Sequence, residues 1–213
     1  MVGGSDEAGL CCAGPCLVLN TRQLQPTWRD VKLFNATVDK VKRQPMRILY
    51  RKLEASKWWV TIFCDASHNS INDGQGSVGA YLIFLSNGYE KGERRVANIL
   101  AWKSTKLKRI CRSSTEAETL ALSQALEEGD LIRDQIISMT GLSKDLVLME
   151  CYCDAKNVIE GLDNNVPPKA TTPYRNEFAL IKQFKEEKKV HKLIHVKGDE
   201  QMADSLTKLG AGE

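Results

Sequence analysis

Residues 58–102 read WWVTIFCDASHNSINDGQGSVGAYLIFLSNGYEKGERRVANILAW. The stretch holds three runs dense in β-branched and aromatic residues, which is the composition of β-strands. Turn-forming residues separate the runs, because NDGQG lies between the first two and Asn87 and Gly88 follow the second. The predicted strands cover residues 59–65, 78–85 and 95–102. Since the connections are short, we expect an antiparallel meander.

The sequence after this meander alternates between helical and strand patterns. Ser113 or Ser114 is a candidate N-cap for a long helix that continues to about residue 139 and is closed by Gly141. Its predicted buried face consists of Leu122, Ala125, Leu126, Leu131, Ile132 and Ile136. The remaining predicted elements are a strand at 145–154, helices at 156–162 and 173–189, a strand at 192–196 and a helix at 203–209. This order predicts an α/β fold with a five-stranded mixed sheet, three antiparallel strands followed by two more, flanked by helices.

One further helix is predicted ahead of the sheet, over residues 27–44. Thr27 is a candidate N-cap, and Asp30 stands three positions later, as in a capping box. An apolar stripe at helical spacing consists of Val31, Phe34, Val38 and Val41, and Pro45 ends the helix. Residues 1–20 lack a clear pattern, and residues 46–54 look extended and basic. We therefore divide the chain into an N-terminal segment, residues 1–57, and a main domain, residues 58–213.

Length and composition restrict the class of protein. A chain of 213 residues with 42% hydrophobic and 27% charged residues is ordinary globular material. No apolar run approaches the roughly 18 residues of a membrane span. Seven cysteines, an odd number with no recognisable signal peptide ahead of them, indicate reduced thiols and a cytoplasmic protein.

The net charge of +3 conceals two opposed segments. Residues 91–112 hold eight basic residues and one acidic residue, whereas residues 113–165 hold three basic and eleven acidic ones. This pattern suits a protein that attracts a polyanion and also holds cations. Two solvated faces of opposite charge would give the same pattern.

Four carboxylates fall at the ends of predicted elements. Asp65 ends the first strand and Asp154 ends the fourth, while Glu118 lies in the first turns of the long helix and Asp204 begins the last one. If the first and fourth strands are neighbours, these side chains converge and repel one another unless cations are bound. Oxygen ligands of this kind suit Mg²⁺ or Mn²⁺, and two such ions are the usual apparatus of phosphodiester hydrolysis. Taken singly, each acid would also suit a turn or a helix dipole.

Residues 59–209 resemble a type 1 ribonuclease H domain, and more closely the version at the end of the Pol polyprotein of copia-like LTR retrotransposons. The resemblance rests on FCDASHNS at 63–70, AWKSTKLKRICRSSTEAETLAL at 101–122, CYCDAKNVIEGL at 151–162 and IHVKGDEQMADSLTKLG at 194–210. It implies a ribonuclease H-like fold. It also implies an endonuclease that hydrolyses the RNA strand of RNA–DNA hybrids.

The resemblance further implies a set of site residues. Asp65, Glu118, Asp154 and Asp204 match the four catalytic acids, which in the family hold two Mg²⁺ ions, with Mn²⁺ able to substitute. Ser113, Ser114 and Thr115 match the polar stretch that contacts the hybrid backbone, although plain N-capping is an equal alternative for Ser113. Glu116 is a weaker candidate for the catalytic Glu, since it lies roughly 200° around the helix from Glu118.

Two departures from the family pattern bear on activity. The loop before the fourth acid is short and lacks the His of cellular members, and Asp199 stands near its place. No basic protrusion helix lies between Leu162 and Pro173. We expect a basic strip to bind the nucleic-acid backbone in its stead: Lys103, Lys106, Lys108, Arg109 and Arg112. A solvated basic loop is the simpler alternative.

Residues 17–57 resemble the tail of a copia-type reverse transcriptase, but the chain has no Tyr-x-Asp-Asp polymerase motif. The sequence thus predicts a metal-dependent hybrid nuclease of retrotransposon reverse transcription. Its expected partners are an RNA–DNA hybrid and the rest of the transcriptase, with no membrane. The expected location is the cytoplasm, with virus-like particles and the nucleus as further options. A catalytically decayed hybrid-binding or scaffold fragment is the alternative function, and the acid order Asp-Glu-Asp-Asp disfavours an integrase.

Overall fold

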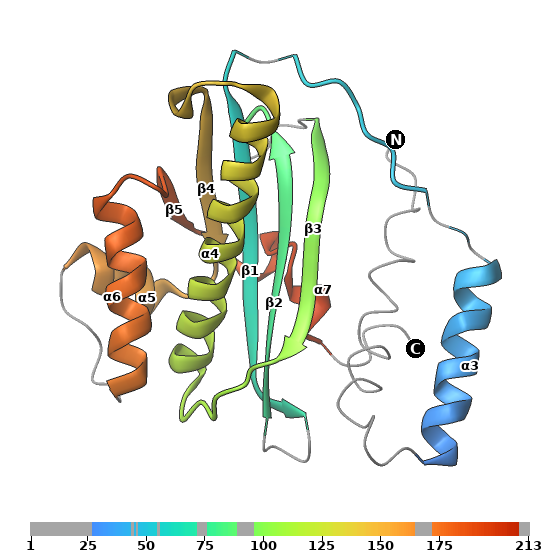
Figure 1. Cartoon of the computed structure of the whole chain (residues 1–213). Coiled ribbons are helices and arrows are strands. Elements are labelled where there is room, and N and C mark those ends of the chain that lie inside the picture. Colours follow the sequence, from blue (N-terminus) through green and yellow to red (C-terminus); the bar gives the residue numbers. More distant parts are fainter. Residues whose placement is uncertain are drawn as a thin grey trace.

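The computed structural model describes residues 27–43, 45, 47–54, 56–71, 76–88, 96–164 and 172–208. One sheet contains β1 (Trp58–Ile71), β2 (Gly76–Ser86), β3 (Ala97–Lys106), β4 (Val147–Cys153) and β5 (Lys192–His195), in the order β3-β2-β1-β4-β5 (Figure 1). β1, β2 and β3 pair antiparallel, whereas β4 pairs parallel to both β1 and β5. This confirms the predicted fold class, a mixed five-stranded sheet of three antiparallel strands and two more, as in the ribonuclease H-like fold.

Helices cover both faces of the sheet. The helices are α3 (Trp28–Arg43), α4 (Ser114–Thr140), α5 (Lys156–Asp163), α6 (Thr172–Glu186) and α7 (Asp204–Thr207), with 3₁₀ turns at Lys144–Leu146 and Gly198–Glu200. Figure 1 shows α4, α5 and α6 on one side of the sheet and α7 on the other. Because both faces are covered, the central strands are apolar along most of their length.

Each face of the sheet has its own core. Ile62 and Cys64 of β1 pack with Leu122 and Leu126 of α4 in the larger core. Phe63, which points to the opposite face, packs in the smaller core with residues that include Tyr152, Ala203 and Leu206. The smaller core therefore fixes α7 against β1 and β4.

The long helix α4 begins and ends as the sequence predicts. The Ser113 side chain accepts a hydrogen bond from the backbone N–H of Glu116, and Gly141 closes the helix with a φ of 69°. Leu131 is the exception on the predicted buried face, because it is 54% exposed. Five residues at about 100° each place Leu131 about 140° around the helix from the buried Leu126.

Two strands continue well past their predicted C-terminal ends. β1 continues past residue 65 to Ile71, and β3 continues past residue 102 to Lys106. Both extensions are polar, so the hydrophobic pattern does not mark them. They are held by backbone pairing to β2, as in the pairs Ser67–Val78 and Val78–Lys106.

The N-terminal helix α3 has the predicted capping box. The Thr27 backbone N–H and hydroxyl donate to Asp30 Oδ2 at 2.7 and 2.6 Å, and the Asp30 N–H donates to Thr27 Oγ1 at 3.3 Å. On its apolar stripe, Val31, Phe34 and Val41 are exposed. The prediction for residues 1–20 lies outside the described residues.

The extended segment after α3 is fixed to the edge of the sheet by one side chain. Asn98 of the edge strand β3 is buried; its Oδ1 accepts from the Arg51 N–H at 2.8 Å, and its Nδ2 donates to the Arg51 carbonyl at 2.7 Å. The amide group thus satisfies both backbone polar groups of Arg51.

We expect Asn98→Ala to release this segment. Loss of the two bonds costs about 1–2 kcal/mol locally, so the Arg51 amide should exchange roughly 5- to 30-fold faster in hydrogen–deuterium exchange. Asn157→Ala, a change of an exposed residue on α5, is the matched control. Unchanged exchange at Arg51 in Asn98→Ala would show that other contacts hold the segment.

Two findings concern the wider predictions. In the described part of the chain, none of the helices has the length and apolar character needed to cross a membrane. Cys64, Cys111, Cys151 and Cys153 are free thiols, and the other three cysteines lie outside the described residues.

Candidate active site

Asp65 and Asp154 lie side by side on neighbouring strands. β1 and β4 pair in parallel up to Cys64 and Cys153, and each aspartate is the next residue of its chain. Neighbouring strands are about 4.8 Å apart, so the two carboxylates start from adjacent backbone positions and the same face of the sheet. Asp154 directly follows the last residue of β4, whereas the sequence predicts that it ends the strand. The prediction that Asp65 ends its strand is wrong, since β1 continues to Ile71, but Asp65 does lie where the pairing with β4 stops.

The other two carboxylates come from helices on opposite faces. Glu118 lies in the first turns of α4, and Asp204 is the first residue of α7. The structure thus places three of the acids on the elements that the sequence assigns to them, and Asp154 directly after its strand.

Burial and mutual repulsion raise the pKa of Asp65, Glu118 and Asp154. Desolvation is the largest cause for Asp65, and the charges of Asp154 and Asp204 raise its pKa further. Desolvation also leads for Glu118, whose pKa rises to about 7 with contributions from Asp154 and Asp65. For Asp154, desolvation comes first and the charge of Asp204 adds to it. Each of the four carboxylates therefore lies within electrostatic reach of at least one other.

One oxygen of this cluster is suited to a cation. Asp154 Oδ1 is buried and has no hydrogen-bond partner. Burying a carboxylate oxygen in this way destabilises the protein unless a ligand binds to it. Mg²⁺ and Mn²⁺ prefer such oxygen ligands, and a divalent ion would also relieve the repulsion. Within the ranges that the structure describes, no three His, Cys, Asp or Glu side chains are already drawn together around a possible ion position. The donor set fits a divalent ion, and binding requires these side chains to adjust.

Two residues that the sequence reasoning did not single out bond directly to the acids. The Thr207 hydroxyl donates to Asp65 Oδ2, and the Lys208 ammonium donates to Asp204 Oδ2. Both lie within the SLTK segment quoted for the resemblance. The sequence signal for both was their position three and four residues after Asp204, at the end of the same short helix.

Hydrogen bonds from neighbouring elements hold α7 beside the site. Gln201, which is buried, donates from Nε2 to the Cys64 carbonyl at 2.9 Å. The Ser104 hydroxyl of β3 donates to the Leu206 carbonyl at 2.6 Å. Because a helix of four residues has little stability of its own, these bonds and the smaller core decide where Asp204 lies.

A third residue contributes charge near the cluster. The charge of His195, on β5, lowers the pKa of Asp154. The sequence analysis gave this residue no role. Asp199, by contrast, is exposed in the 3₁₀ turn Gly198–Glu200.

The predicted nucleic-acid contacts of the SST stretch lie at the N-terminus of α4. Ser113 is the N-cap of α4, which confirms the N-capping role that the sequence analysis gave as its alternative. Ser114 is exposed and Thr115 is half-buried. Glu116 Oε2 accepts a bond from the N–H of Arg112, the residue before the N-cap, at 2.7 Å, and with the Ser113 bond this forms a variant of the capping box. Glu116 therefore stabilises the start of α4.

The predicted basic strip divides into two parts. Lys103 and Lys106 lie on β3, and Lys103 stands over the Tyr81 ring with Nζ 6.0 Å from its centre. Lys108, Arg109 and Arg112 lie in the loop before α4, where Arg109 Nη1 donates to Glu177 Oε1 of α6 at 2.5 Å. Arg109 thus anchors the loop, whereas Lys108 and Arg112 are exposed.

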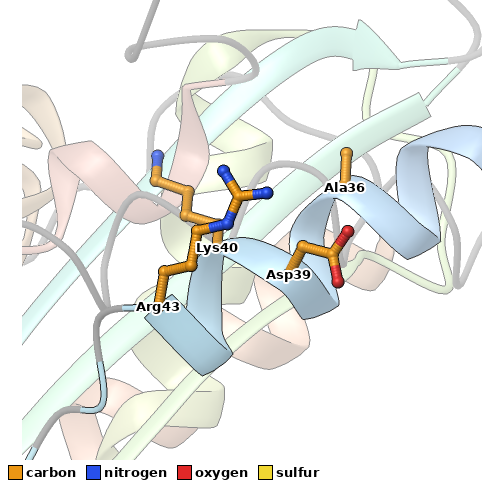
Figure 2. Close-up of a pocket in the computed structure, with 4 residues that line it drawn as sticks. All are labelled: Ala36, Asp39, Lys40 and Arg43. Atoms are coloured by element: carbon orange, nitrogen blue, oxygen red, sulfur yellow. The ribbon is translucent and has the colours of Figure 1, made fainter.

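A separate pocket lies on the N-terminal helix. Figure 2 shows Ala36, Asp39, Lys40 and Arg43 of α3 lining it. None of the four acids is among these residues, so the pocket is not part of the candidate active site.

Comparisons with known proteins give a limited result. No protein-family model matches the chain. A search of curated proteins finds no match either. Similar solved structures include LC11-RNase H1 in complex with an RNA/DNA hybrid, at 20% identity over 69% of this chain and 92% of that chain, with a TM-score of 0.47.

Two further structures differ in how much of their own length is matched. RNase H1 from the halophilic archaeon Halobacterium salinarum NRC-1 has 16% identity over 70% of this chain and 93% of that chain, with a TM-score of 0.44. The prototype foamy virus protease–reverse transcriptase has 11% identity over 88% of this chain and 28% of that chain, with a TM-score of 0.41. Because these TM-scores lie below 0.5, the function proposed below rests on the residues of the site.

Proposed function

We propose that the chain is a metal-dependent endonuclease that hydrolyses the RNA strand of RNA–DNA hybrids. One observation supports this function above all. Asp65, Glu118, Asp154 and Asp204 come from four separate elements and gather in a site where burial and mutual repulsion raise the pKa of three of them. Such a costly arrangement is expected where carboxylates share divalent cations.

The four acids would hold two Mg²⁺ ions, with Mn²⁺ as a substitute. Bound ions of this kind activate a water molecule and stabilise the leaving oxygen in phosphodiester hydrolysis. The protein supplies ionised carboxylates in fixed positions. Since the pKa of Glu118 is about 7 without metal, metal binding should release a proton and strengthen as the pH rises through neutrality.

Contacts to the hybrid are proposed at the N-terminus of α4 and the loop before it. The N-terminus of a helix favours phosphate, because its N–H groups and dipole are directed at the ligand. Ser113, Ser114 and Thr115 are placed there, with Lys108 and Arg112 exposed in the loop. Selectivity for a hybrid would come from its shape and from 2′-hydroxyl contacts.

We expect the double variant Lys108→Ala/Arg112→Ala to bind hybrid more weakly, with a weaker dependence on salt. Each phosphate contact that is lost should reduce the slope of log affinity against log salt by about 0.9. Fluorescence anisotropy with a labelled hybrid at several salt concentrations measures this slope. Lys156→Ala/Lys182→Ala, on α5 and α6, removes the same charge elsewhere as a control. Equal slopes in the two double variants would show that the loop does not bind the backbone.

The wider setting of the enzyme is also part of the proposal. We propose that residues 58–213 are the ribonuclease H domain of a copia-like retrotransposon Pol polyprotein and that residues 1–57 are the tail of its reverse transcriptase. The motifs quoted in the sequence support this origin. It would make an RNA–DNA hybrid and the rest of the transcriptase the partners. It would also place the protein in the cytoplasm, in virus-like particles or in the nucleus.

One observation favours a second candidate, a hybrid-binding or scaffold fragment without catalysis. Among the described residues, no three potential ligands are assembled around an ion position. A decayed site would keep the fold and the basic loop but bind no metal.

A panel of substrates separates the two candidates. The wild-type chain should cut the labelled RNA of a hybrid in Mg²⁺ or Mn²⁺, and leave single-stranded RNA, duplex RNA and duplex DNA of the same sequence largely intact. EDTA should stop the reaction. Hybrid binding without cutting in either metal would favour the scaffold, and cutting of all four substrates would contradict hybrid selectivity.

A further inference from the structure

Thr207 occupies an unusual position for a hydroxyl side chain. It is the last residue of α7 and is only 2% exposed, and its hydroxyl donates to Oδ2 of Asp65, which is itself 7% exposed. The bond joins residues 142 positions apart in the sequence. It thus connects the C-terminal helix to the first acid of the candidate site.

The backbone around Thr207 is well fixed. Ser104 holds the carbonyl of Leu206, and Gln201 bonds the carbonyl of Cys64, the residue before Asp65. Leu206 and Ala203 are buried in the smaller core. The hydroxyl is therefore presented to Asp65 from a rigid support, and its orientation is decided by packing on both sides.

The chemistry of the donor separates Thr207 from Lys208. A neutral hydroxyl gives one hydrogen bond to a carboxylate oxygen and leaves the negative charge and further lone pairs available to a cation. Lys208 instead places a positive charge on Asp204, and its side chain is 60% exposed. A lysine in that position competes with a metal ion for the carboxylate, whereas a threonine orients the carboxylate for it.

We infer that Thr207 is a positioning residue of the proposed metal site, whose hydroxyl fixes the Asp65 carboxylate in the orientation that binds the ion. This inference rests on the proposed function. Partners that orient metal ligands in this way are typically worth 10- to 100-fold in metal affinity or activity. A solely structural role is the competing explanation, because the same hydroxyl lies 3.0 Å from the Asp204 carbonyl.

The test compares metal affinity in variants of the full chain. Thr207→Val keeps the shape and removes the hydroxyl, and Thr207→Ser keeps the hydroxyl. Thr61→Val is the matched control, since it makes the same change at another buried threonine, whose hydroxyl donates to Glu150, a carboxylate outside the four acids. Mn²⁺ binding is measured by electron paramagnetic resonance, and kcat and KM for a hybrid are measured separately. Thermal unfolding in EDTA shows that each variant is folded, and Thr207→Ala replaces the valine variant if that one is not.

We expect Thr207→Val to bind Mn²⁺ about 10- to 100-fold more weakly and to lose kcat with little change in KM. Thr207→Ser should restore both, and Thr61→Val should keep wild-type affinity. Wild-type affinity in Thr207→Val, or an equal loss in Thr61→Val, would overturn the positioning role while leaving the nuclease intact. A wild-type chain that neither binds Mn²⁺ nor cuts hybrid would instead overturn the proposed function, and the inference with it.

Discussion

Asp154→Asn is expected to abolish cleavage of the hybrid and, at the same time, to stabilise the metal-free protein. Asp154 carries a buried oxygen without a hydrogen-bond partner and lies in electrostatic reach of the other acids. Loss of a metal ligand removes several kcal/mol of transition-state stabilisation, which is a loss of roughly 1,000-fold or more in rate. Loss of the negative charge relieves repulsion, worth about 1 kcal/mol or 2–4 °C in Tm.

This prediction is specific because it combines a loss of activity with a gain in stability. Cleavage is followed with a labelled hybrid in Mg²⁺, and Tm is followed by circular dichroism in EDTA. Asp134→Asn is the control, because this exposed aspartate of α4 lies outside the cluster. It should leave the cleavage rate unchanged. If Asp154→Asn lowered both stability and activity, its role would be to hold the fold, and the interpretation as a metal ligand would fail.

The second large effect is a loss of stability of the metal-free protein as the pH rises. Glu118 has a pKa of about 7 in the folded chain against an ordinary value of 4.5. The folded state therefore holds this proton more tightly than the unfolded state. The contribution is fully present below pH 4.5 and is lost as the pH rises through about 7. It amounts to about 1–3 kcal/mol, since the side chain is partly exposed. The raised pKa values of Asp65 and Asp154 act in the same direction.

The measurement compares Tm in EDTA between pH 4.5 and 8 for the wild type and Glu118→Gln. The difference between the two curves reports Glu118 together with its coupling to Asp65 and Asp154, because groups outside the cluster titrate alike in both. Wild-type stability should fall relative to the variant across this range, and saturating Mg²⁺ should reverse the fall above pH 7. Parallel curves would show that the pKa of Glu118 is not raised in the folded chain.

Much of this architecture could be predicted from the sequence because strong local signals agree with the fold. The apolar runs predict every strand of the sheet, and Ser113 and Gly141 predict both ends of α4. The polar extensions of β1 and β3 could not be predicted, since they are held by pairing with β2 and have no hydrophobic pattern. Leu131 was wrongly predicted to be buried because its residue type is apolar, although its side chain is exposed in the structure.

The four acids could be singled out in the sequence by their places at or near the ends of elements, and the structure places each within electrostatic reach of at least one other. The residues that bond to these acids could not be predicted from the sequence. Thr207 reaches Asp65 only because α7 folds back onto the far face of the sheet, a contact between distant parts of the chain. Arg109 was grouped with the basic strip, but the packing of α6 against α4 turns it toward Glu177. Such roles depend on tertiary contacts, and residue type alone does not reveal them.

The most direct test of the account is cleavage of a 5′-labelled RNA strand in an RNA–DNA hybrid by the wild type and Asp65→Asn, each in Mg²⁺ and in EDTA. We predict cutting of the RNA strand by the wild type in Mg²⁺ alone, and none by Asp65→Asn. Cutting that survives either EDTA or Asp65→Asn would contradict the metal-dependent site. Absence of cutting in every case, with the hybrid still bound, would leave a binding fragment without nuclease activity.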